Sequence, residues 1–148
     1  VWQTGKDYYQ NCQHALKEAI ASSGCDSKNI LCTAFLSNMP MAYALADVVI
    51  SRAGASSISE LCLLGKASIL VPSPNVAEDH QTHNAMALVK QDAAILVKDI
   101  EAKEKLVRLA LELLSDTEQI AILERNILKL GRADSAQQIA REVIALVK

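Results

Sequence analysis

Short apolar segments alternate with segments of helical periodicity, and this alternation most constrains the fold of the chain. The apolar segments predict strands at residues 1–3, 30–35, 47–51, 68–71 and 93–97. Apolar residues recur at helical spacing between them, at residues 8–20, 40–46, 57–64 and 80–89. Such alternation implies a parallel sheet with right-handed crossovers and helices on both faces. We therefore predict an α/β fold, a doubly wound three-layer α/β/α arrangement.

Beyond residue 97 the pattern is helical only. Three apolar stripes recur at helical spacing, within residues 106–114, 120–130 and 136–147. Ser115 followed by Glu118 resembles a capping box, which predicts that a helix begins at Ser115. The C-terminal third is therefore expected to be helical.

Length and composition fit one domain of this kind. The chain has 148 residues, of which 51% are hydrophobic and only 3% aromatic, so an aliphatic core is available. We expect a single domain over residues 1–148. The chain starts without Met, and Val1 and Trp2 read as the inside of a strand, so we interpret it as a piece of a longer protein.

Charge and cysteine usage exclude several classes of function. The formal net charge is −2 and Lys and Arg are not clustered, which argues against a nucleic-acid partner. None of the four cysteines forms a C-x-x-C pair, so reduced thiols are favoured over disulfides or zinc. No apolar run has the length of a transmembrane segment, and no signal peptide is visible.

The segment RAGASSISE, at residues 52–60, is the most informative. It follows a predicted strand and opens a helix, and ligands of doubly wound sheets bind beyond the carboxyl ends of strands. Small residues and free N–H groups at such a turn suit a phosphate; here they are Gly54, Ala55, Ser56 and Ser57. Glu60 could accept two hydrogen bonds from a ribose diol. Alternatively, Ser56 or Ser57 is only an N-cap and Glu60 a first-turn acid. The segment is neither a P-loop nor a G-x-G-x-x-G motif.

A second polar segment, EDHQTHN at residues 78–84, follows the predicted strand at 68–71. His80, Gln81 and Asn84 would project from the first turn of the next helix, and their amide and imidazole groups suit sugar hydroxyls. One alternative is a metal site that uses Asp79, His80 and His83; against it, the two His are not spaced i, i+4 and no further ligand is evident. The other is an ordinary solvated helix start.

A third segment, at residues 35–39, follows the predicted strand at 30–35. The ring of Phe35 could lie against a base, and the backbone of Leu36 could bind a pyrimidine edge. The alternative, that Phe35 and Met39 fill the core, is favoured by the local pattern alone. No Ser-His-Asp set, carboxylate pair or activated cysteine is present, so we predict no catalytic residue in this chain.

Together these segments resemble the C-terminal half of the MurG family, over nearly the whole chain. The residues that carry the resemblance most specifically are 41–60, 68–72 and the H-Q-x-x-N-A pattern at 80–85. His80 stands where some members have Gln, and Ala67 where Pro is usual. The resemblance implies one Rossmann-like half of a GT-B glycosyltransferase. It also implies an inverting N-acetylglucosaminyltransferase that converts lipid I to lipid II in peptidoglycan synthesis.

The resemblance assigns roles to residues of this chain. It implies that Leu36 reads uracil with Phe35 and Met39 beside the base, and that Glu60 holds the ribose. Gly54, Ala55, Ser56 and Ser57 would face the diphosphate, and Arg52 is a further expected substrate-binding residue. The sugar would face His80 and Gln81, with Asn84 supporting them. The implied partners are UDP-GlcNAc and, through an N-terminal half, a lipid-linked muramoyl-pentapeptide, with no cofactor or metal.

The resemblance also implies what this chain lacks. The acceptor surface and the general base lie in the family's N-terminal half, so the isolated chain is expected to be inactive. The family's location implies the bacterial cytoplasm, with the longer protein peripheral on the cytoplasmic face of the inner membrane. Two alternatives remain open: a donor-binding subunit of a split GT-B enzyme, and a nucleotide-binding module without transfer activity.

Overall fold

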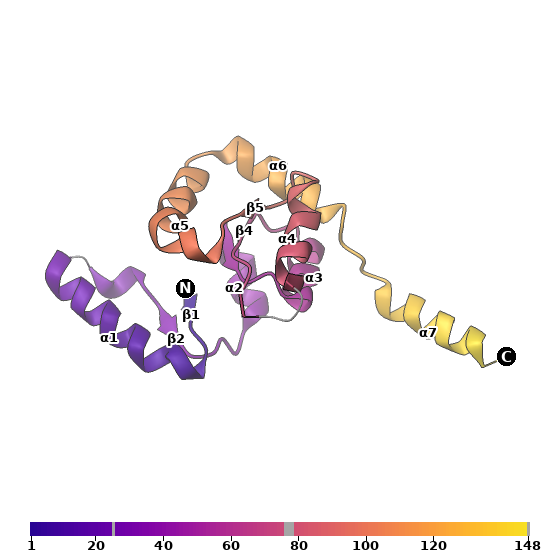
Figure 1. The fold of residues 1–148 in the computed structure, drawn as a ribbon, viewed down its shortest axis with the longest axis horizontal. Helices are drawn as coiled ribbons and strands as arrows, with labels where there is room; N and C mark the ends of the chain where they lie inside the picture. The colour runs from indigo at the N-terminus through magenta and orange to yellow at the C-terminus, as the bar shows by residue number, and fades with distance from the viewer. Residues whose placement is uncertain (25, 76–78, 148) are drawn as a thin grey trace. The chain divides into compact units, whose positions relative to one another are not determined.

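Strands and helices alternate along the chain as far as β5, and only helices follow it (Figure 1). The computed structural model describes residues 1–24, 26–75 and 79–147. Every strand pairing in this part of the chain is parallel. The elements are β1 (Trp2–Gln3), α1 (Lys6–Ser23), the 3-10 helix η1 (Ser27–Asn29), β2 (Cys32–Thr33), α2 (Met39–Leu45), β3 (Val49–Ser51), α3 (Ala55–Leu64), β4 (Ser68–Leu70), α4 (His80–Val89), β5 (Ile95–Leu96), α5 (Asp99–Leu114), α6 (Thr117–Leu128) and α7 (Ser135–Leu146). The predicted α/β class with a helical C-terminal third is confirmed.

The chain divides into two compact units, Val1–Leu45 and Ala46–Lys148. In the first unit β1 pairs with β2, and α1, which connects them, contacts β2. Gly24 ends α1 in the left-handed conformation (φ 67°), which glycine adopts without strain, and its N–H donates to the C=O of Ile20 (3.0 Å). The first unit is therefore one βαβ crossover followed by α2.

The second unit is built on a three-stranded sheet in the order β3-β4-β5. Its central strand, β4, is fully buried, with Ser68, Ile69 and Leu70 all at 0% exposure. Alternation along the strand sends Ile69 to one face and its two neighbours to the other. Both faces of β4 are therefore covered, as expected for a strand in a parallel sheet with helices on both sides, and the buried Ser68 hydroxyl donates to the C=O of Lys66 (2.7 Å).

The core of the second unit lies where α5 and α6 cover this sheet. Its buried members come from β4 and the residues flanking β4 and β5, and from the two helices: Ala67, Ile69, Val71, Val97, Leu113 and Leu123. Helices α5 and α6 contact each other, α3 contacts α4 and α6, and α4 contacts β5. The loops after β3 and β4 leave this sheet at the same edge, because the two strands are parallel neighbours.

Strand pairing among the described residues joins β1 to β2 in the first unit and gives the order β3-β4-β5 in the second. Strand segments and helical segments are visible in a sequence, but hydrogen bonding between strands far apart in the chain is not. The bounds of α2, α3 and α4 agree with the prediction to within two residues, the usual uncertainty of such boundaries, whereas α1 and α5 extend further than their apolar stripes.

The capping box expected at Ser115 is wrong. The N-cap of α6 is Asp116, whose side chain accepts a hydrogen bond from the N–H of Gln119 (2.9 Å). Ser115 instead donates its hydroxyl to the C=O of Leu111 (3.0 Å) and so belongs to the end of α5. A Ser next to an Asp leaves the cap position ambiguous in sequence, because both residues are good N-caps.

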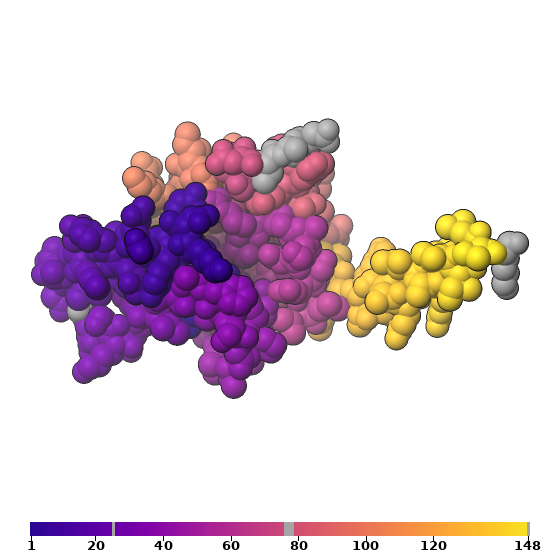
Figure 2. Space-filling model, turned by 90° about the horizontal axis from the view of Figure 1, so that it is seen from below, coloured from indigo at the N-terminus to yellow at the C-terminus, as the bar shows by residue number. Residues whose placement is uncertain are grey.

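Helix α7 differs from the others in the second unit because it contains no buried residue. Its side chains form the yellow surface in Figure 2. Ile139, Val143, Ile144 and Leu146 are all more than half exposed. None of the helices in the described ranges is long and apolar enough to cross a lipid bilayer.

Candidate functional site

The three segments singled out by the sequence follow β2, β3 and β4. The loop after β2 belongs to the first unit and the other two to the second, so they are described separately. Strands β3 and β4 are parallel neighbours, with Ser51 opposite Leu70, so the loops that leave them share one sheet edge. Residues 76–78, which include Glu78 of the polar segment, lie outside the described residues.

Helix α3 begins at this edge without a side-chain cap. Its N-cap is Gly54, whose C=O accepts the N–H of Ile58 (3.0 Å). Ser56 and Ser57 lie inside the helix, so the alternative that one of them is the N-cap is wrong. The first N–H groups of α3 therefore have no side-chain acceptor at the cap, and the positive end of the helix dipole favours an anion there.

Gly54 leaves open space beside these N–H groups. Its conformation (φ −67°, ψ 148°) is one that any residue adopts. A Cβ at this position would meet nothing closer than the Ser57 Oγ, at 3.9 Å. Since neither packing nor backbone geometry requires glycine, the missing side chain is most useful to a ligand that approaches the backbone.

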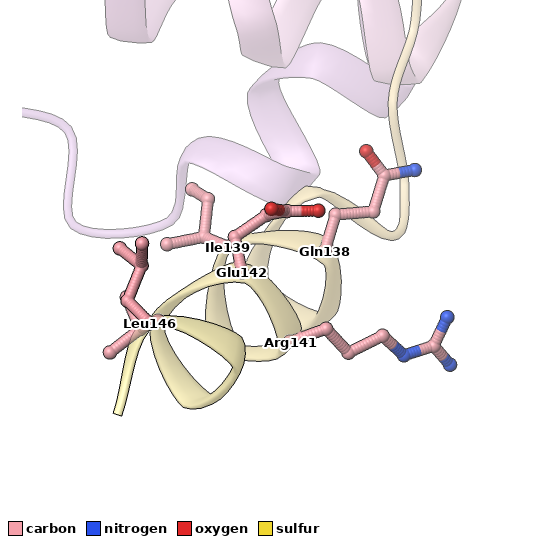
Figure 3. A pocket seen from close by; sticks show the side chains of 6 residues that line it. Gln138, Ile139, Arg141, Glu142 and Leu146 are labelled. Carbon is pink, nitrogen blue, oxygen red and sulfur yellow. The ribbon is translucent and has the colours of Figure 1, made fainter. Parts of the chain in front are cut away.

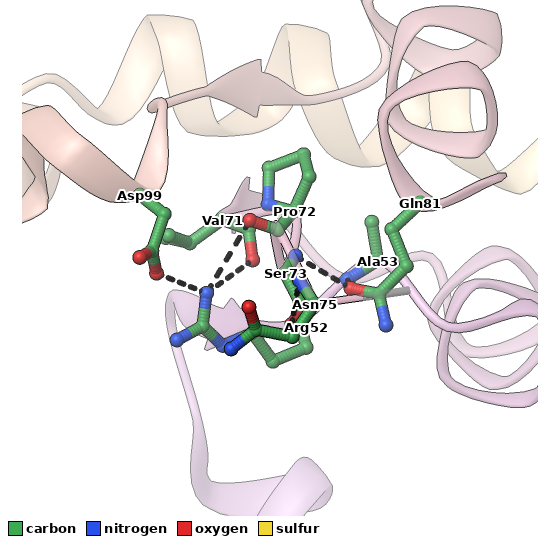
Figure 4. Close-up of polar contacts among 8 residues, drawn as sticks. All are labelled: Arg52, Ala53, Val71, Pro72, Ser73, Asn75, Gln81 and Asp99. Carbon is green, nitrogen blue, oxygen red and sulfur yellow. Dashed lines mark hydrogen bonds and ion pairs between the residues drawn. The ribbon is translucent and has the colours of Figure 1, made fainter. Parts of the chain in front are cut away.

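Two side chains from the first turns of α4 hold the backbone of Ala53, just before Gly54. The Gln81 Oε1 accepts hydrogen bonds from the N–H of Ala53 (3.2 Å) and the N–H of Ser73 (2.9 Å), as Figure 4 shows. The Asn84 Nδ2 donates to the C=O of Ala53 (3.2 Å). Both polar backbone groups of the fully buried Ala53 are thereby satisfied from α4. The support of His80 and Gln81 that the resemblance implies for Asn84 stays a prediction, since this contact is with Ala53.

Arg52 makes a second set of contacts at the same edge. Its Nη1 donates to the C=O of Val71 (3.2 Å) and of Pro72 (3.3 Å), and it forms an ion pair with Asp99 at the start of α5 (Figure 4). The Arg52 side chain remains 55% exposed, so a ligand can still approach the guanidinium. Arg52 thus connects the ends of β3 and β4 to α5.

Glu60 and His80 are the other predicted residues of the second unit. Glu60 lies on α3 and His80 is the first residue of α4, and both are exposed. Asp79, the N-cap of α4, adopts a left-handed conformation (φ 53°). The chain therefore turns sharply just before His80, which sets the direction in which α4 begins.

In the first unit, Phe35 is 70% exposed, so it does not fill the core of that unit. The N–H of Leu36, expected to bind a base, donates to the Oε1 of Gln3 (2.8 Å). Met39, partly buried, begins α2. A base bound at Leu36 would have to replace or share the contact with Gln3.

Gln3 and Asp99 are the contributors that the sequence analysis missed. Gln3 ends β1 and Asp99 begins α5, each far from its partner in the chain. An acidic residue in the first turn of a helix is ordinary, and a Gln in a strand carries no signal. Only their contacts in the three-dimensional structure identify these residues.

A hollow of about 450 Å³ lies on α7 and contains none of the predicted site residues (Figure 3). It is lined by Gln138, Ile139, Arg141, Glu142, Val143 and Leu146. Because one helix supplies every lining residue, the hollow has walls on one side only, and we do not place the site there. Within the described ranges, no group of three His, Cys, Asp or Glu side chains is placed to hold a metal ion.

The fold and family define the class of this protein. The model of the glycosyltransferase family 28 C-terminal domain matches residues 1–139. The domain is a Rossmann-like α/β half of a GT-B glycosyltransferase, with parallel strands and the loops described above at their carboxyl ends.

Relatives then give the particular family. A UDP-N-acetylglucosamine–N-acetylmuramyl-(pentapeptide) pyrophosphoryl-undecaprenol N-acetylglucosamine transferase of Bacteroides fragilis is 54% identical over 148 residues, all of this chain and 38% of that protein. The enzyme of the same name from Parabacteroides distasonis is 50% identical over 147 residues, or 99% of this chain and 38% of that protein. The chain belongs to the MurG family and corresponds to its C-terminal half. It spans about 38% of the length of these relatives.

Solved structures agree on the fold. The crystal structure of Acinetobacter baumannii MurG superposes with a TM-score of 0.80 at 22% identity, covering 97% of this chain and 42% of that one. An NMR structure of ALG13 superposes less closely, with a TM-score of 0.51 at 22% identity, covering 79% of this chain and 67% of that one.

Proposed function

We propose that residues 1–148 form the donor-binding domain of an N-acetylglucosaminyltransferase and bind UDP-GlcNAc. The observation that carries the proposal is the start of α3, which has no side-chain cap and has open space at Gly54. A diphosphate there would accept hydrogen bonds from the first N–H groups of the helix. The names of the relatives supply the identity of the donor and of the sugar transferred.

The other predicted residues take their places around this diphosphate in the proposal. Glu60 holds the ribose hydroxyls, and His80 and Gln81 face the sugar. The backbone of Leu36 reads the uracil, beside Phe35 and Met39. Arg52 is exposed enough to add a positive charge near the leaving UDP while its Nη1 remains bonded to the protein.

The full reaction in this proposal is inverting transfer onto a lipid-linked muramoyl-pentapeptide, which converts lipid I to lipid II in peptidoglycan synthesis. It would take place at the cytoplasmic face of the bacterial inner membrane. We place the acceptor site and the general base in the portion of the relatives that this chain does not span. Positioning of reactants can supply roughly 7–11 kcal/mol and a general base a rate factor of about 10²–10⁴. We therefore expect no transfer by the isolated chain.

Calorimetric titration of the chain with UDP-GlcNAc, UDP-glucose, ADP-ribose and NAD tests the proposal. Preference for the two uridine ligands is the expected result, and equal binding of all four, or of none, contradicts it. An assay of UDP release with UDP-GlcNAc and a lipid-linked acceptor tests the second part. Acceptor-dependent turnover by the chain alone would favour a complete single-domain enzyme, and turnover restored by a separate protein would favour a split one.

A further inference from the structure

We propose that Gln81 is a positioning residue that holds the diphosphate-binding turn in place through its Oε1 atom. The inference deepens the proposed function and rests on it for the identity of the ligand. The resemblance implies only that Gln81 faces the sugar. In the structure, its carbonyl oxygen is committed to two backbone N–H groups from different loops, those of Ala53 and Ser73.

These two contacts connect the segments on which the site depends. Ala53 immediately precedes Gly54, the N-cap of α3, while Ser73 follows β4 on the way to α4. Neither N–H belongs to the ladders that pair β3, β4 and β5. One oxygen therefore bridges the turn before α3 and the loop after β4, and it links both of them to the first turn of α4.

Loss of these contacts would destabilise the backbone at Ala53. It is fully buried, so an N–H that lost its acceptor would have no access to water. Asn84 holds the C=O of the same residue from the next turn of α4. Helix α4 therefore hydrogen-bonds both the N–H and the C=O of Ala53, the residue that precedes the N-cap of α3.

The contacts also settle which way the Gln81 amide points. Both partners are N–H donors, so the atom between them must be the oxygen. The Nε2 atom then points away from the two loops, as Figure 4 shows. Any sugar atom that meets Gln81 meets donors only, so the hydroxyl oxygen at that position must act as an acceptor.

Two readouts separate positioning from direct sugar contact. The first is amide hydrogen exchange of Ala53 and Ser73, followed by NMR in the chain without ligand. Gln81→Ala should speed exchange at both amides several-fold, whereas Gln81→Glu keeps the acceptor oxygens and should leave both slow. Gln91→Ala, which removes an exposed amide just after α4, is the matched control and should change neither. Unchanged exchange at both amides in Gln81→Ala would overturn the proposal.

The second readout is the affinity for UDP, which carries no sugar. Positioning predicts that Gln81→Ala weakens binding of UDP and of UDP-GlcNAc by similar factors, several-fold or more, while Gln91→Ala binds as wild type. A loss confined to UDP-GlcNAc, with UDP binding unchanged, would overturn positioning in favour of sugar contact alone. If the wild-type chain binds no UDP, the proposed function fails; exchange at Ala53 and Ser73 then decides the positioning role by itself.

Discussion

Three side chains, Arg52, Gln81 and Asn84, fix the backbone at the carboxyl edge of the second sheet. Arg52 bonds the carbonyl groups that follow β4, Gln81 bonds two N–H groups, and Asn84 bonds one carbonyl. The backbone partners therefore determine whether each side chain must be a hydrogen-bond donor or an acceptor. Isosteric exchange of an amide for a carboxylate should therefore be costly at Asn84, which donates, and tolerated at Gln81, which accepts.

Asn84→Asp should destabilise the chain and Gln81→Glu should not. An Asp at 84 loses the donor and places a carboxylate against the buried C=O of Ala53, whereas a Glu at 81 still accepts both N–H groups. We expect a loss of about 1–3 kcal/mol for Asn84→Asp, the cost of an unsatisfied buried group. Urea unfolding at neutral pH measures the difference, and equal stability of the two variants would contradict it.

Cys62 gives a residue-scale prediction of pH dependence. Burial raises the pKa of the Cys62 thiol, so the folded chain keeps the proton at a pH where the unfolded chain begins to release it. The folded state then binds more protons than the unfolded state, and the free energy of unfolding falls as pH rises above about 8.5 towards the raised folded pKa. Below that range the thiol has no effect.

Unfolding titrations of the wild-type chain and Cys62→Ala between pH 7 and about pH 10 test this prediction. The wild-type chain should lose more stability than the variant over this range. Parallel curves for the two proteins would show that the thiol does not contribute.

At the scale of elements, the connection after α6 packs closely on α3. A Cβ added at Gly131 would lie 2.8 Å from the C=O oxygen of Cys62 and 3.1 Å from its carbon. These atoms belong to a helix backbone and cannot move aside at low cost. Gly131 is therefore a glycine that packing requires, in contrast to Gly54.

Gly131→Ala should destabilise the chain by about 1–3 kcal/mol, the usual cost of overpacking. Gly54→Ala is the comparison variant: its Cβ meets open space, so it should cost only the weaker N-cap preference of Ala and lower the unfolding midpoint less than Gly131→Ala does. Thermal unfolding compares the two. A lower midpoint for Gly54→Ala than for Gly131→Ala would refute this account of the two glycines.

The elements also show how much of the structure the sequence predicts. The spacing of apolar residues and the turn residues are local signals, so the order of strands, helices and the loops between them was predicted correctly. The partners of Arg52 depend on contacts such as that with Asp99, 47 residues away in the chain, which no local pattern records. The ligand roles of the site residues, Glu60 among them, stay predictions.

At the scale of the whole molecule, α7 contributes no residue to the core of the second unit. It supplies no buried residue, and the core cluster is built from β4, β5 and their flanking residues with α5 and α6. Which strands are neighbours was also not predictable, because the alternation of strands and helices is the same for different strand orders.

Truncation after Ala133 should therefore leave the core intact. We expect the thermal midpoint to change by less than about 2–4 °C, which corresponds to about 1 kcal/mol in a larger domain. Differential scanning calorimetry of the full and shortened chains provides the measurement. A larger fall in the midpoint would show that α7 stabilises the second unit through contacts not evident from its exposure.

The central claim, that the carboxyl edge of the sheet binds a uridine diphosphate, is tested most directly by titrating UDP into the chain and its Glu60→Ala variant in the calorimeter. Glu104→Ala, which removes an exposed carboxylate on α5, is the matched control. We predict that wild type and the control bind UDP alike, and that Glu60→Ala binds about 1.5–3 kcal/mol more weakly, the range for hydrogen bonds to a charged group. Equal affinity in all three folded proteins would contradict the role of Glu60, and absence of UDP binding by the wild-type chain would contradict the claim itself.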